Sequence, residues 1–186
     1  MKMLMKIAMS VGLGLSLAAI PVQGIAALQQ GAKAPDFTLN AAQGGKPFVL
    51  SLKETLKKGP VVLYFFPAAF TTGCTMEAHL FAEANDDFNR LGARVVGVTA
   101  GNIHRIEEFS KSECRDKFAV AADPAAKVAA KYDATMQGSD GKPLSNRTSF
   151  VIAPNGTILL SYTDRSPQAH IEKTMAAVRA WNATHR

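Results

Sequence analysis

The residue best suited to chemistry is Cys74, which follows the loop Pro67-Ala-Ala-Phe-Thr-Thr-Gly after an apolar run at 61–66. The run predicts a buried strand, and the residues from Cys74 onward predict a helix with Thr71 or Thr72 as its N-cap. In the first turn of that helix, free backbone N–H groups and the helix dipole favour the thiolate over the thiol. The pattern therefore indicates a reactive sulfur rather than a small buried hydrophobe, although free cysteines often serve as the latter.

Residues 1–26 have the composition of a secretory signal peptide. Lys2 and Lys6 precede an apolar run at 7–20, Pro21 interrupts the run, and small residues follow it. The apolar run of 14 residues is shorter than the roughly 20 residues that a membrane span requires, so a retained anchor is the less favoured alternative. We predict cleavage near Ala26, export to the periplasm, a mature domain at 27–186 and no stable membrane association after cleavage.

The charge of the chain is basic but scattered. The formal net charge is +6, and loss of two lysines with the signal peptide leaves +4. Only Lys57 and Lys58 are adjacent, and no basic run interleaves with aromatic residues, so nucleic-acid binding is not expected. The histidines lack the mutual spacing of metal ligands: they are His79, His104, His170 and His185. We expect no metal or cofactor, and we expect these histidines to be solvated or locally bonded.

Strands and helices alternate along the rest of the chain. The pattern predicts strands at 36–40, 48–50, 61–66, 94–99, 118–121, 149–152 and 157–162. It predicts helices at 51–58, from the segment of Cys74 to about 91, at 103–117 after an Asn102 cap, at 125–132 and from 167 to beyond 181. This order indicates one α/β domain, with a mixed central sheet and helices on both faces, and it resembles the thioredoxin-like fold.

Three separated motifs resemble one family. The spacing Pro67-x-x-x-Thr71-x-x-Cys74 resembles the active-site signature of the peroxiredoxins, and its surroundings are similar to the bacterioferritin-comigratory or Q-type branch. The segment 31–39 is similar to the opening of that family, and the segment from Arg147 to residue 156 is similar to its arginine-bearing strand. The likeness spans about residues 31–183.

This resemblance implies a thiol-dependent peroxidase that reduces hydrogen peroxide and organic hydroperoxides. Cys74 would attack the peroxide, Thr71 would hold it, and Arg147 would favour and orient the thiolate. Pro67 would shield the site from water, while backbone N–H groups of Gly73 and Cys74 would complete the donors for the developing charge. Glu77, on the next turn of the helix, has two interpretations: it orients the arginine side of the site, or it is an exposed helix glutamate, which is the default expectation.

A sulfenic acid on Cys74 condenses readily with a second thiol, and Cys114 is the only other cysteine. Many relatives place the resolving cysteine five residues after the first, where this chain has His79. Cys114, expected half-exposed at the edge of the apolar stripe of the 103–117 helix, resembles the members that carry it on the following helix. The alternative is a structural Cys114 with an external thiol resolving the intermediate.

The resemblance also implies a thioredoxin-like or other thiol reductant, and a monomer or weak dimer. Two other functions of this fold are weighed against it. An exported thiol–disulfide oxidoreductase without peroxidase activity requires Cys-x-x-Cys, but Thr71 and Glu77 stand at the two possible places. A copper-delivery protein requires Cys-x-x-x-Cys, but residue 78 is alanine.

Overall fold

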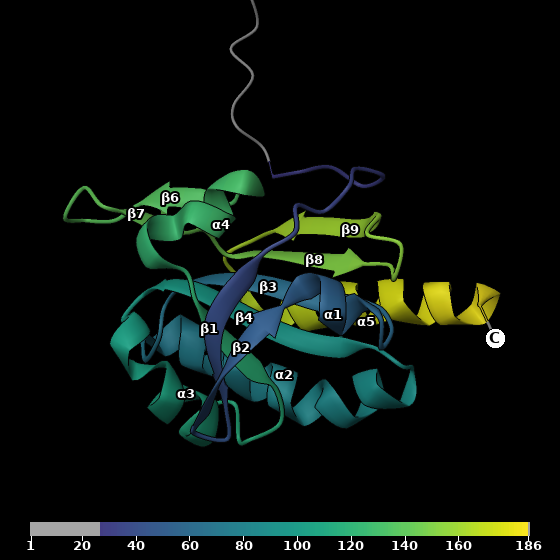
Figure 1. Ribbon diagram of the computed structural model, residues 1–186, viewed down its shortest axis with the longest axis horizontal. Helices are drawn as coiled ribbons and strands as arrows, with labels where there is room; N and C mark the ends of the chain where they lie inside the picture. The colour runs from purple at the N-terminus through teal and green to yellow at the C-terminus, as the bar shows by residue number, and fades with distance from the viewer. Residues whose placement is uncertain (1–26, 186) are drawn as a thin grey trace, which may run out of the picture.

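The computed structural model describes residues 27–185, and the predicted signal peptide at 1–26 lies outside that range (Figure 1). The strands are β1 (Thr38–Gln43), β2 (Lys46–Ser51), β3 (Val61–Ala68), β4 (Arg94–Gly101), β5 (Ala119–Ala122), β6 (Thr135–Gln137), β7 (Pro143–Ser145), β8 (Thr148–Ile152) and β9 (Ile158–Thr163). The α-helices are α1 (Leu52–Leu56), α2 (Thr72–Arg90), α3 (Ile106–Ser112), α4 (Lys127–Lys131) and α5 (Pro167–Thr184), with 3-10 turns η1 (Ile103–Arg105) and η2 (Pro124–Ala126).

Seven strands form one mixed sheet in the order β2-β1-β5-β4-β3-β8-β9. The central pairs β3–β4 and β4–β5 are parallel, whereas β8 runs antiparallel to β3. Strands β6 and β7 pair with each other as a separate hairpin. The predicted α/β class and mixed central sheet are confirmed.

Strand β3 is buried on both faces, as its unbroken apolar run predicts. Val62, Tyr64 and Phe66 join the core beneath α2, α3 and α5, whereas Leu63 and Phe65 join the core beneath α1 and α4. Helices therefore cover both sides of the sheet (Figure 1). The end of β3, between these two layers, leads directly into the loop before Cys74.

The predicted helix at 103–117 is wrong in its extent. A 3-10 turn precedes α3, which ends at Ser112. Asn102 has a left-handed φ of 53°, and its side-chain amide donates to the Ala69 carbonyl at 2.8 Å instead of capping the helix. A tertiary hydrogen bond has thus replaced the local one. The sequence pattern also missed the β6–β7 hairpin, whose short strands show no clear alternation.

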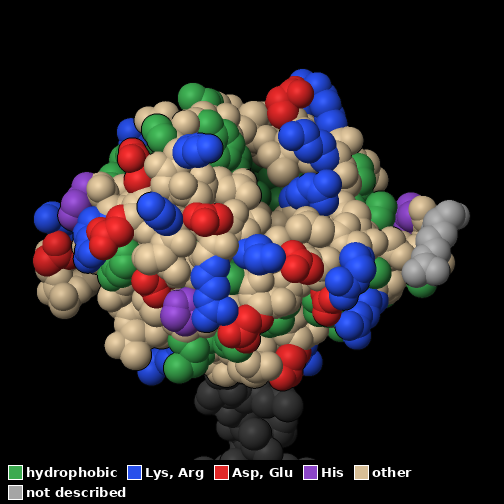
Figure 2. Space-filling model, turned by 90° about the horizontal axis from the view of Figure 1, so that it is seen from below, with side chains coloured by type: hydrophobic (Ala, Val, Ile, Leu, Met, Phe, Trp, Pro, Cys, Tyr) green, Lys and Arg blue, Asp and Glu red, His purple; other side chains and the backbone are tan. Residues whose placement is uncertain are grey.

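The surface agrees with the charge pattern of the sequence. On the face shown in Figure 2, lysine and arginine side chains lie among aspartates and glutamates rather than in one basic patch. Within residues 27–185, no helix has the length and apolar character needed to cross a bilayer.

Candidate active site

Cys74 lies in the first turn of α2, as predicted. Thr71 is the N-cap by backbone geometry, and its hydroxyl donates to the carbonyl of Ala68 at 3.0 Å. The N–H of Thr75 makes the first bond of the helix, to the carbonyl of Thr71 at 2.9 Å. The N–H groups of Gly73 and Cys74 precede that bond and have no partner within the helix, so the positive end of the helix dipole lies in the turn that holds Cys74.

Tertiary contacts hold the loop between β3 and α2. Ala69 donates its N–H to the carbonyl of Gly101 at 3.2 Å, and the carbonyl of Pro67 accepts from the hydroxyl of Thr99 at 3.2 Å. Phe70 has a left-handed φ of 63°, a conformation that is costly for a residue with a side chain. These contacts fix the approach of the chain to Cys74.

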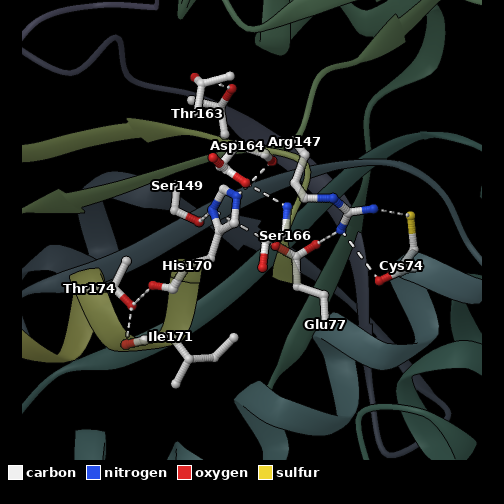
Figure 3. A network of polar contacts seen from close by, with 12 residues as sticks. Cys74, Glu77, Arg147, Ser149, Thr163, Asp164, Ser166, His170, Ile171 and Thr174 are labelled. Carbon is white, nitrogen blue, oxygen red and sulfur yellow. Dashed lines mark hydrogen bonds and ion pairs between the residues drawn. The ribbon is translucent and has the colours of Figure 1, made fainter. Parts of the chain in front are cut away.

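Arg147 brings a cation to the thiol from the segment between β7 and β8. Its Nη2 lies 3.6 Å from Sγ of Cys74, and its Nη1 lies 3.4 Å from the carbonyl oxygen of Gly73 (Figure 3). The arginine side chain is only 12% exposed, so solvent screens its charge weakly. Of the predicted site residues, Arg147 therefore contacts Cys74 directly, while Pro67 lies at the end of β3 and Thr71 is the N-cap of α2.

Glu77 is buried, so the default expectation of an exposed helix glutamate is wrong. Its Oε2 accepts a hydrogen bond from Nη1 of Arg147 one turn beyond Cys74. Burial raises the pKa of Glu77 to about 8, although the charge and hydrogen bond of Arg147 oppose that rise. Glu77 follows Cys74 at i+3, the helical spacing that places both side chains on one face, and this spacing was the available signal.

The sequence pattern missed a buried histidine behind this pair. His170 of α5 is fully buried, and its Nδ1 lies 2.8 Å from the hydroxyl oxygen of Ser149 on β8. Burial lowers the pKa of His170, and the Arg147 charge lowers it further, while the Asp164 carbonyl and carboxylate oppose the shift. In the sequence, the only indication that His170 is buried is its position in the apolar stripe of α5, directly before Ile171.

Cys114 lies in the turn after α3, and it is buried rather than half-exposed. Burial raises the pKa of the Cys114 thiol well above its usual range, and the charge of Glu113 adds to that rise. Within residues 27–185 both cysteines are free thiols, and both belong to the core cluster on one face of the sheet.

Three side-chain contacts join the turn that contains Cys114 to α2, and two of them are ion pairs. Arg115 and Asp116, in that turn, have left-handed φ values of 51° and 61°. The contacts are a hydrogen bond between His79 and Glu113 at 2.9 Å and the ion pairs Glu83–Arg115 at 3.3 Å and Asp86–Lys117 at 3.1 Å. We call residues 113–117 the Cys114 turn. Its side chains dock along α2 while its backbone is locally strained.

No cluster of histidine, cysteine, aspartate and glutamate with the geometry to hold a metal ion occurs in the part of the chain that the structure describes. The groups around Cys74 are a cation and a carboxyl, which suit a thiolate and a polar substrate.

Comparisons with known proteins agree with this geometry. The AhpC/TSA family profile matches residues 30–161. The chain is 35% identical to the chloroplastic peroxiredoxin Q of Arabidopsis thaliana over 156 residues, which cover 83% of this chain and 69% of that protein. It is 34% identical to the putative peroxiredoxin MT1643 of Mycobacterium tuberculosis over 155 residues, which cover 82% and 97%. The crystal structure of peroxidoxin BcpB from Mycobacterium tuberculosis superposes with a TM-score of 0.72 at 30% identity, covering 82% of this chain and 97% of that one.

A buried thiol at a helix start on a thioredoxin-like sheet defines the class of cysteine-dependent oxidoreductases. Within that class the chain belongs to the AhpC/TSA family and is related to the Q-type peroxiredoxins. The predicted thiol peroxidase function is confirmed at the level of the family, and a thiol–disulfide oxidoreductase without peroxidase activity is not favoured.

Proposed function

We propose that Cys74 is the peroxidatic thiol of this peroxidase, acting on hydrogen peroxide and organic hydroperoxides. The observation that carries the proposal is the 3.6 Å contact between the Arg147 guanidinium and Sγ of Cys74. A fixed cation favours the ionised sulfur, which is the nucleophilic form. The cation stays in place when charge passes to the substrate, so it also stabilises the transition state.

In the first step the thiolate of Cys74 attacks one peroxide oxygen and the O–O bond breaks. The sulfur becomes a sulfenic acid, and the other oxygen leaves with the electron pair as hydroxide or alkoxide and takes a proton from solvent. Thr71 is exposed, and its hydroxyl can turn from the Ala68 carbonyl toward the peroxide. Pro67, half-buried at the end of β3, restricts water on the other side of the loop.

In the second step Cys114 condenses with the sulfenic acid, forming an intramolecular disulfide and releasing water. Cys114 is buried, so its turn has to leave the core before its sulfur reaches Cys74. The location of Cys114 beyond the end of α3 supports this step, because a turn opens at lower cost than a helix interior. An external dithiol, thioredoxin-like or of another kind, then reduces the disulfide.

We further propose that residues 1–26 direct export and are removed, so that the mature protein works in the periplasm. We also propose that it is a monomer or weak dimer. The Lys2 and Lys6 charges before an apolar run support this location. The mass of the mature N-terminus and cell fractionation test the export, and sedimentation tests the assembly. An uncleaved cytoplasmic product contradicts the localisation without affecting the chemistry.

The direct test of the catalytic proposal is peroxide consumption by Cys74→Ser and Cys114→Ser. Loss of all turnover in the first variant and one equivalent of peroxide consumed by the second are expected. Mass spectrometry of the oxidised wild-type protein should find the 74–114 link. Peroxide consumption by Cys74→Ser at the wild-type rate refutes the assignment of Cys74, and absence of the link refutes that of Cys114.

A further inference from the structure

A buried polar cluster lies behind Arg147, on the side away from Cys74 (Figure 3). It consists of Glu77 from α2, Ser149 from β8 and His170 from α5, and each of these side chains is fully buried. Elements far apart in sequence converge here, and burial of polar groups carries a free-energy cost unless they are satisfied. The hydrogen bonds within the cluster therefore decide which groups carry protons.

The hydrogen bonds of His170 define its tautomer. Its Nε2 lies 3.0 Å from the backbone carbonyl oxygen of Asp164, which only accepts, so Nε2 carries the proton. In the neutral ring Nδ1 is then an acceptor, and it receives the hydroxyl of Ser149 at 2.8 Å. Tyr162 packs edge-on against the ring at 5.1 Å between centroids. Burial lowers the pKa of His170, which favours this neutral form.

The two oxygens of Glu77 have different surroundings. Oε2 accepts from Arg147, whereas Oε1 has no hydrogen-bond partner among the described residues and lies 3.9 Å from Nδ1 of His170. An ionised Oε1 would lie beside an unprotonated ring nitrogen that offers it no donor in a dry site, which is unfavourable. A proton on Oε1 removes this conflict and leaves Oε2 free to accept from the arginine.

We propose that His170 is a positioning residue for the reactive thiol: its neutral ring keeps the proton of Glu77 on Oε1, and the charge of Arg147 therefore remains available to Cys74. The inference rests on the proposed role of Cys74. The carboxyl and the thiol compete for one guanidinium, so an ionised Glu77 would withdraw the cation from the sulfur. The charged groups around Glu77 and His170 are Arg147, the Asp164 carboxylate and the Cys74 thiolate itself.

Two substitutions at one position separate this role from packing. His170→Gln places an amide donor near Oε1 and favours the carboxylate, whereas His170→Phe fills the space without a donor. The measurement is the rate of Cys74 alkylation by iodoacetamide against pH, followed by mass spectrometry of its peptide. We expect His170→Gln to shift the midpoint up by about one pH unit, with about tenfold slower alkylation below it, and His170→Phe to shift it far less.

The matched control is Thr174→Val, one turn along α5, where a buried hydroxyl bonds only to carbonyls of its own helix. It should leave the midpoint unchanged. In a Glu77→Gln background, His170→Gln should have no effect, because residue 77 no longer ionises. Equal shifts in the two His170 variants, or a shift that persists in the Glu77→Gln background, overturn the proposal.

Ser149→Ala keeps the proposal testable if the His170 variants do not fold. Loss of the hydroxyl frees Nδ1 to accept the proton of Oε1, so the midpoint should not rise. A rise of about one unit or more in this variant overturns the proposal. If alkylation of wild-type Cys74 follows the pH dependence of a free cysteine, the proposed function fails as well. If the wild-type midpoint differs from that of a free cysteine but the variants do not move it, only the role of His170 is refuted.

Discussion

Nη2 of Arg147 lies 3.6 Å from Sγ of Cys74, although the two residues are 73 positions apart in the chain. Strand β8 pairs with β3, and this pairing brings the residue before β8 to the start of α2. The contact therefore depends on the register of the sheet as well as on the two side chains.

Replacing Arg147 by alanine should lower kcat/KM for hydrogen peroxide by about 10²–10³, the cost of removing one fixed donor from a developing charge. Arg147→Lys keeps the charge without the planar fork, so it should recover only part of the rate. Stopped-flow peroxide consumption measures both variants. A wild-type rate in Arg147→Ala would remove the arginine from the mechanism.

Cys114 should be alkylated far more slowly than Cys74 in the reduced protein at neutral pH. Its pKa is raised well above the usual range by burial, so little thiolate forms there. Peptide mass spectrometry after timed iodoacetamide treatment compares the two sites. Denaturant should remove the difference, and equal rates in the native protein would contradict the buried location.

Loosening the Cys114 turn should speed disulfide formation. Glu83→Gln and Asp86→Asn together remove both ion pairs between carboxylates of α2 and cations of this turn. Exposed pairs contribute about 0–1 kcal/mol each, so the rate should rise a few-fold rather than by orders of magnitude. Quenched-flow trapping of the 74–114 link measures the rate.

The control for this experiment is Lys57→Gln, which removes an exposed ion pair with Glu54 on α1, outside both thiol-bearing segments. It should leave the rate of disulfide formation unchanged. If the double variant matches Lys57→Gln, the ion pairs do not limit release of Cys114.

Glu77 should make stability depend on pH. Burial raises its pKa from the ordinary 4.5 to about 8, so the folded protein holds a proton that the unfolded chain releases. This contribution is full below pH 4.5 and is lost as the pH rises through about 8. Urea unfolding at about pH 6 and about pH 9 should show a fall in the wild-type protein that is smaller in Glu77→Gln. The exposed Glu107→Gln serves as the control, and an equal fall in all three proteins would place the proton elsewhere.

Much of the fold follows from local pattern. The apolar run of β3 and the loop that ends at Cys74 predict the strand, the helix and the placement of the thiol. The strands predicted at 149–152 and 157–162 are confirmed as β8 and β9, which pair antiparallel through a turn that contains Gly156.

The remainder depended on contacts between distant segments. Nothing in the local sequence distinguishes Glu77 from other helix residues, because its partner Arg147 is brought to it by the pairing of β8. His170 contacts Ser149 only because α5 packs on that strand. The start of α3 was misplaced because the side chain of Asn102 bonds to the carbonyl of Ala69, a contact that no local pattern reports. Its end was misplaced because Arg115 and Asp116 have left-handed φ values, through which a right-handed helix does not continue. Cys114 was consequently assigned to a helix surface instead of a buried turn.

Phe70 has a left-handed backbone conformation that glycine adopts more easily, but its aromatic ring makes two contacts that glycine could not. It packs edge-on against Phe109 of α3 at 5.2 Å, and the Arg105 guanidinium lies 3.7 Å above it. The ring of Phe70 therefore connects the loop before Cys74 to α3, the helix that precedes Cys114. Under the proposed resolving role of Cys114, any movement of α3 that accompanied release of its turn would be transmitted through Phe70 to the loop before Cys74.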